Sequence, residues 1–116
     1  MLYALYYVID SGDYEKFVLK HSEKSWAPSA MYYAGNLFLI IQNDQRAQEV
    51  YDVIISSFYH TTYYEHALYR SFYMAAEERD RKGARMKGDE FLEEFPGSEK
   101  AEMVRKRLAI LKKGDY

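Results

Sequence analysis

Apolar residues recur every three or four positions along most of the chain, which is the spacing that places them on one face of an α-helix. The alternation of apolar and polar residues typical of a strand is not sustained anywhere, and the β-branched run Val53–Ile55 sits inside a longer helical pattern. The sequence therefore predicts an all-α fold of about seven helices. Their apolar stripes begin at Leu2, Tyr14, Ala30, Ala47, Ala67, Ala84 and Ala101.

Hydroxyl residues and prolines mark the expected helix ends. Ser25, Thr62 and Ser98 each precede an apolar stripe and can accept a hydrogen bond from a free backbone N–H, so we expect them to be N-caps. Pro28 falls in a first turn, where its missing N–H costs nothing, and Pro96–Gly97 ends one helix before the next begins. The connections are only a few residues long, so consecutive helices should lie antiparallel as hairpins.

Two landmarks recur along the chain. Segments that begin at Ser25, Thr62 and Ser98 align without gaps, at spacings of 37 and 36 residues. A turn signal recurs at Gly12–Tyr14, Asn43–Gln45, Arg79–Arg81 and Gly114–Tyr116, with aspartates 31, 36 and 35 residues apart. Two landmarks that share a mean period of roughly 35 residues indicate one duplicated unit.

The densest basic stretch, Arg79–Arg85, is open to two interpretations. If Gly83 supplies a left-handed stop, the cations lie at a helix C-terminus, where the helix dipole favours them. If the turn lies at Asp80 instead, the same cations lie at a helix start, where the dipole disfavours them.

Small and aromatic residues also fall in a pattern that resembles the tetratricopeptide repeat. The matches are Gly35, Ala47 and Tyr51 in residues 28–61, and Ala84, Phe91 and Pro96 in residues 65–97. The phrase from Glu94 to Ala101 is similar to the link between repeats in bacterial cell-envelope members, such as the outer-membrane assembly lipoprotein and the periplasmic cell-division coordinator. Two positions depart from the pattern: Phe72 stands where a small residue is expected, and Tyr59–His60 replaces Phe-Pro.

The resemblance covers residues 11–116 and implies a single domain over 1–116, built of antiparallel hairpins stacked as a right-handed solenoid. It also implies a periplasmic or envelope-associated protein, although a cytoplasmic one stays open. The chain ends at Gly114–Tyr116, where a second-type helix should begin, so we expect it to be a fragment of a longer repeat array.

Composition narrows the possible partners. The chain has 16 Lys and Arg against 18 Asp and Glu, a net charge of −2, so nucleic acid is not an expected partner. It has no cysteine, which excludes disulfides, thiolate nucleophiles and cysteine-bound metals. The apolar residues Met1–Ile9 are far too few to span a membrane and are expected to form a buried helix.

No arrangement of reactive residues predicts catalysis. Among His21, His60 and His66, no pair has the i, i+4 spacing of a helical zinc site. The carboxylate pairs Glu77–Glu78 and Glu93–Glu94 are adjacent in sequence, so their side chains point about 100° apart on a helix. We expect no enzyme activity, no cofactor and no metal.

Tyrosine carries the functional signal, with 13 copies in 116 residues. In tetratricopeptide arrays the first helix of each hairpin lines the concave groove. The resemblance therefore implies that a groove binds an apolar and acidic peptide or partner helix through Tyr32, Asn36, His66, Tyr69, Tyr73 and Arg105. Two alternatives stay open. The tyrosines could pack between hairpins, and the chain could be an architectural subunit of a larger cell-envelope or motor-type complex, packing through apolar outer faces.

Overall fold

The computed structural model describes residues 12–59 and 61–113. These residues form six helices and no strand, which confirms the predicted all-α fold. The helices are α2 (Asp13–Lys20), α3 (Ala27–Ile40), α4 (Asp44–Ser57), α5 (Thr62–Glu77), α6 (Arg81–Glu94) and α7 (Ala101–Lys112). The helix expected at residues 1–9 lies outside the described residues, as does the turn expected at Gly114–Tyr116.

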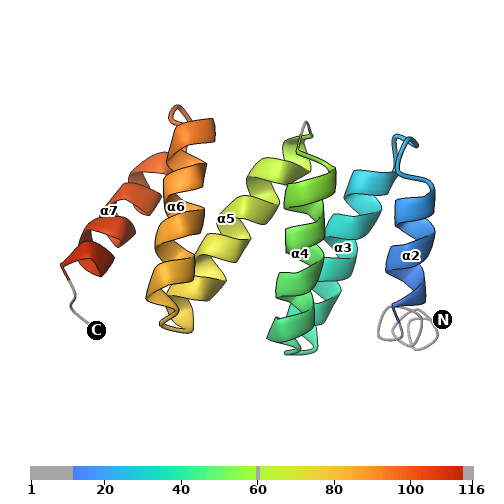
Figure 1. Ribbon diagram of the computed structural model, residues 1–116, viewed down its shortest axis with the longest axis horizontal. Coiled ribbons are helices and arrows are strands. Elements are labelled where there is room, and N and C mark those ends of the chain that lie inside the picture. Colours follow the sequence, from blue (N-terminus) through green and yellow to red (C-terminus); the bar gives the residue numbers. More distant parts are fainter. Residues whose placement is uncertain (1–11, 60, 114–116) are drawn as a thin grey trace.

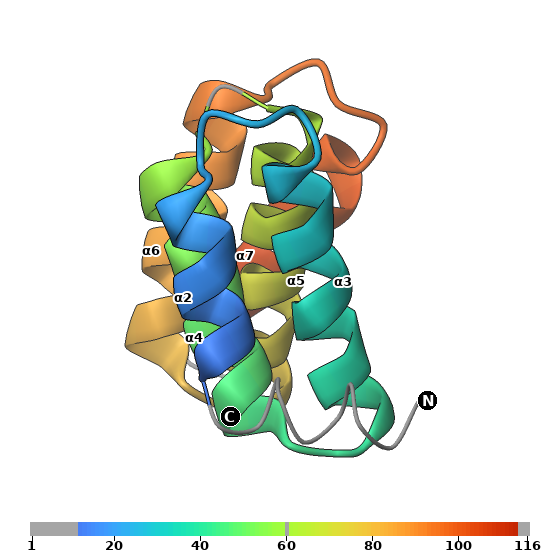
Figure 2. The same cartoon turned by 90° about the vertical axis from the view of Figure 1, so that its right-hand side faces the viewer.

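The six helices follow one another in a row along the longest axis of the molecule (Figure 1). Each helix packs against its neighbour in the chain, so α3 and α4 form one antiparallel hairpin and α5 and α6 form the next. Seen along the row, α2, α4 and α6 make one layer and α3, α5 and α7 make the other (Figure 2). The second layer therefore presents three helices that run in the same direction.

Helix α5 lies between two hydrophobic cores. The first core is built by α2, α3 and α4 around Phe38 and Tyr51, and α5 adds Ala67 to it. The second core is built by α5, α6 and α7 around Phe72 and Phe91. Helix α5 is thus buried on two sides, and its remaining exposed face carries tyrosine, histidine and arginine.

One geometry recurs every 37 residues. The last residues of α3 and α5 are 37 positions apart. The same interval separates the last residues of α2 and α4, those of α4 and α6, and the first residues of α4 and α6. The hydrogen bonds at these ends match, because Phe58 N–H donates to Ile54 O and Phe95 N–H donates to Phe91 O, both at 2.8 Å. The sequence-based period of roughly 35 was therefore too short, because its turn landmarks did not mark equivalent residues.

The turns within the two hairpins are built alike. Gln42 and Arg79 adopt left-handed backbone conformations, with φ of 64° and 61°. The next residues, Asn43 and Asp80, donate their N–H groups to a carbonyl five residues earlier at 2.8 and 2.9 Å, which closes the preceding helix. Their side chains then cap α4 and α6 by accepting backbone N–H groups.

These turns settle the position of the basic stretch. The left-handed residue is Arg79, so of the two interpretations the one with the turn at Asp80 is correct and the one with a stop at Gly83 is not. Gly83 lies in the first turn of α6, and its N–H donates to the Asp80 carboxylate at 3.0 Å. Arg81 and Lys82 consequently lie at a helix start, where the Asp80 carboxylate offsets their unfavourable interaction with the dipole.

The three predicted N-caps are wrong. Ser25 and Thr62 do not cap their helices, and the N-cap of α7 is Lys100, without a side-chain cap. The Ser98 hydroxyl lies in the preceding turn, where it accepts the Lys100 N–H at 3.1 Å and donates to Glu65 on α5 at 2.7 Å. At the start of α3, α5 and α7 a backbone N–H is satisfied by a carbonyl of the connecting turn instead. The donors of these bonds are the buried residues Ala27, Tyr64 and Ala101.

Candidate functional site

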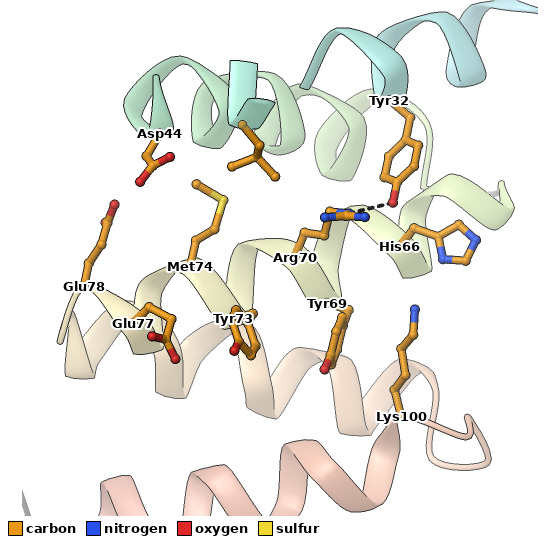
Figure 3. Close-up of a pocket in the computed structure, with 11 residues that line it drawn as sticks. Tyr32, Asp44, His66, Tyr69, Arg70, Tyr73, Met74, Glu77, Glu78 and Lys100 are labelled. Atoms are coloured by element: carbon orange, nitrogen blue, oxygen red, sulfur yellow. Dashed lines mark hydrogen bonds between the residues drawn. The ribbon is translucent and has the colours of Figure 1, made fainter. Parts of the chain in front are cut away.

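A groove of about 500 Å³ lies between α3 and α5 (Figure 3). The starts of α4 and α7 close its two ends. Its lining is aromatic in the middle and charged towards the ends, and consists of Tyr32, Leu39, Asp44, His66, Tyr69, Arg70, Tyr73, Met74, Glu77, Glu78 and Lys100.

Four of the six predicted site residues meet in this groove. Tyr32 enters from α3, and His66, Tyr69 and Tyr73 come from α5. The α5 residues share one face because they are spaced by three and four positions. The sequence spacing was therefore sufficient to place the three α5 residues on one face. The packing of the hairpins places Tyr32 of α3 across the groove from them.

Tyr32 is held in place by Arg70. The Arg70 Nε donates to the Tyr32 hydroxyl at 2.7 Å, and its guanidinium lies 5.7 Å from the centre of the ring. The ring of Tyr32 also packs against Tyr63 and His66, at centroid distances of 5.5 and 5.7 Å. This wall of the groove is therefore ordered by contacts within the protein.

Tyr69 and Tyr73 form the floor but differ in their burial. Their ring centroids are 6.4 Å apart, and the Lys100 ammonium lies 4.8 Å from the Tyr69 ring. Tyr69 also contacts Phe91 of the second core at 6.0 Å, whereas the side chain of Tyr73 is 45% exposed. Tyr69 thus packs between hairpins as well as lining the groove, and Tyr73 is the more accessible of the two.

Asn36 and Arg105 do not line the groove. The Asn36 side chain accepts a hydrogen bond from the Tyr51 hydroxyl at 2.5 Å. Burial raises the pKa of that hydroxyl. Arg105 is exposed on α7, where it donates to the Pro96 carbonyl at 3.1 Å and pairs with Glu102 at 3.3 Å.

The wrong prediction that Arg105 lines the groove has a simple cause. The sequence alignment paired Thr62 with Ser98, 36 residues on, but the structural period is 37. One residue corresponds to about 100° of rotation around a helix, so the alignment selected the wrong face of α7. The structural counterpart of Tyr32 and Tyr69 is Lys106, which lines a smaller cavity of about 160 Å³ between α5 and α7.

Sequence reasoning missed the charged residues of the groove. Arg70 could have been found, because it follows His66 by four positions and precedes Tyr73 by three. Asp44 lies at the start of α4, which was not expected to line the groove, and Lys100 is the N-cap of α7, from which only Arg105 was expected. Only the packing of hairpins brings them to it.

The remaining histidines and helices add no further site. His21 packs against the rings of Phe17 and Trp26, and His60 lies outside the described residues. In residues 12–59 and 61–113 no three His, Asp or Glu side chains are grouped closely enough to hold a metal ion. None of the described helices has the length and apolar character needed to cross a membrane. Comparison of the chain with protein-family models, curated proteins and solved structures found no significant match.

Proposed function

We propose that this chain is a tetratricopeptide-type repeat protein that holds a segment of a partner protein in the groove between α3 and α5, without catalysing a reaction. The observation that carries the proposal is the meeting of Tyr32, His66, Tyr69 and Tyr73 in one groove of about 500 Å³. Partly exposed aromatic side chains with hydrogen-bonding tips are the residues that dominate binding in protein interfaces.

The proposed repeat architecture, a right-handed solenoid of stacked hairpins, is supported by the recurrence of equivalent turns. Two hairpins with the same turn geometry and a 37-residue period are what a duplicated unit produces. This period is longer than the 34 residues of the usual tetratricopeptide repeat. The small residues Gly35, Ala47 and Ala84, which match the repeat pattern, are all buried.

Peptide display tests the groove directly. A library of random dodecapeptides would be selected on the purified chain, and the affinity of recovered peptides measured by fluorescence anisotropy. We expect Tyr73→Ala to weaken these peptides by about 30-fold, equivalent to about 2 kcal/mol, because Tyr73 is an accessible aromatic anchor. Its unfolding free energy should change much less, because a side chain that is 45% exposed has little packing to lose.

The matched control is Tyr59→Ala, which removes a tyrosine that is 56% exposed and does not line the groove. Equal affinity losses for both variants would contradict the proposal. A Tyr73→Ala protein that loses folding stability and shows no separate binding defect would mean that this tyrosine only packs between hairpins.

A second candidate function, an architectural subunit that packs through its outer faces, is favoured by one surface patch. Phe17 on α2 and Trp26 before α3 stack with centroids 6.0 Å apart and planes 16° apart, and their side chains are 55% and 42% exposed. Exposed apolar surface of this kind marks interaction sites. Under this function, replacing both residues with Ser would release the chain from its native complex in size-exclusion chromatography, while Tyr73→Ala would not.

A further inference from the structure

The groove has opposite charges at its two ends. Asp44, Glu77 and Glu78 lie at the end where α3 and α5 finish, and His66 and Lys100 lie at the end where α5 and α7 begin (Figure 3). Asp44 and Glu78 point toward each other across the acidic end. The tyrosine floor separates the two ends.

The charges at the acidic end differ in whether the protein neutralises them. Glu77 is paired with Arg107 at 2.8 Å. Asp44 and Glu78 have no hydrogen-bond or ion-pair partner for their carboxylates among residues 12–59 and 61–113. The nearby cations Arg79, Arg81 and Lys82 do not line the groove. Two facing carboxylates with no internal counter-ion leave room for a cation from outside.

The helix dipoles do not explain this polarity. A helix dipole favours cations at the C-terminus and anions at the N-terminus. Glu77 and Glu78 lie at the C-terminus of α5, and Lys100 is the N-cap of α7, so each opposes the dipole of its own helix. Asp44 is the exception, because it lies in the first turn of α4, where the dipole of that helix favours an anion. Because α3, α5 and α7 run in parallel, their dipoles add to the side-chain charges at both ends of the groove (Figure 1).

The dimensions of the groove favour an extended occupant. His66 and Glu78 are 12 residues apart along α5, which is about 18 Å. A helix of that length, 10–12 Å across with its side chains, fills roughly 1,700 Å³ and would lie mostly outside a groove of about 500 Å³. An extended chain covers the same length with about five or six residues.

We propose that the groove binds an extended segment whose two end residues carry opposite charges. This inference rests on the proposed function. A Lys or Arg side chain of the partner lies between Asp44 and Glu78, and an Asp or Glu side chain lies against His66 and Lys100. The intervening apolar residues pack on Tyr69 and Tyr73, so the two charged residues are separated by about five or six positions.

Two charge reversals test this polarity in the dodecapeptide selection. Glu78→Lys adds a cation at a helix C-terminus, and Lys100→Glu adds an anion at a helix N-terminus, so both changes agree with the dipoles and should preserve folding. Peptides selected on the native chain should carry one basic and one acidic residue at the expected separation. Each reversal should weaken these peptides at least tenfold. Reselection on Glu78→Lys should lose the basic residue, and reselection on Lys100→Glu should lose the acidic one.

The matched control is Glu93→Lys, which makes the same charge change at the C-terminal end of α6, away from the groove. It should leave peptide affinity within twofold of the native value. Peptides that depend on Tyr73 but show no charge pair, or do not respond to the two reversals, would overturn this inference and leave the proposed function standing. Charged residues at the two ends of the dodecapeptide, 11 positions or about 17 Å apart in a helix, would indicate a helical occupant and would also overturn it. If no selected peptide depends on Tyr73, both proposals fail.

Discussion

Gly88 on α6 lies directly against the ring of Phe72 on α5: a β-carbon at residue 88 would be 2.9 Å from Cε1 of Phe72. The preceding hairpin has the same pair with the sizes exchanged. Gly35 on α3 faces Tyr51 on α4, where a β-carbon would be 2.6 Å from the Tyr51 Cε1. Residues 35 and 72 are structural equivalents, 37 positions apart, and so are residues 51 and 88. Each crossing thus combines one glycine with one large ring, on opposite helices.

The first prediction follows from these crossings. The methyl group that Gly35→Ala adds must displace the buried Tyr51 ring, at a cost of about 1–3 kcal/mol. Helix propensity returns about 1 kcal/mol, so the unfolding free energy should fall by up to about 2 kcal/mol. Urea titration measures it. Gly97→Ala is the control, because nothing lies within 4 Å of its β-carbon position, and a comparable loss there would contradict the packing explanation.

The exchange at this crossing also shows what the sequence could not reveal. Phe72 appeared to break the repeat pattern, because a small residue was expected in the first helix of the hairpin. Its compensation by Gly88 depends on which residues face each other across two helices, and no linear pattern contains that relationship. Helical periodicity was enough to predict the all-α fold and the shared face of His66, Tyr69 and Tyr73. The face of α7 required the register to be correct to one residue, and so Arg105 was misplaced.

The docking of α7 gives a second prediction. Leu108 is only 3% exposed, and its methyl groups lie against the backbone of Gly88. Leu108→Ala should therefore cost about 2–5 kcal/mol of unfolding free energy, the range for a large buried side chain. Ile110→Ala provides the comparison on the same helix, because Ile110 is 47% exposed and should lose far less. Similar losses at the two positions would mean that α7 is not docked through its Leu108 face.

The side-chain cap of α6 gives a third prediction. The Asp80 carboxylate accepts the Gly83 N–H at 3.0 Å and lies beside the cations at the start of the helix. Asp80→Ala should reduce the unfolding free energy by about 1 kcal/mol, the usual contribution of an N-cap. Asp80→Asn keeps an acceptor and removes the charge, so it should lose less stability than Asp80→Ala. The part of its loss that comes from the charge should be largest at low salt, which separates the two effects. An Asp80→Ala protein with native stability would contradict the capping role.

Alkaline pH provides the last prediction, through Tyr51. Burial raises the pKa of the Tyr51 hydroxyl, which donates to Asn36, above the value of about 10 expected in the unfolded chain. The folded protein therefore retains this proton at a pH where the unfolded chain has released it. Its contribution to stability is complete below about pH 10 and is lost as the pH rises from there toward the folded-state pKa, by at most about 1.4 kcal/mol per pH unit.

Tyr51→Phe removes the titrating group but keeps the ring. The difference in unfolding free energy between the native chain and this variant, measured by urea titration at pH 8, 9, 10 and 11, should thus remain constant up to about pH 9 and shrink above pH 10. Tyr64 also has a raised pKa, through burial and its hydrogen bond to Glu90, so the variant should retain part of its own alkaline destabilisation. If the two curves stay parallel through pH 11, the Tyr51 proton is held no more tightly in the folded protein than in the unfolded chain.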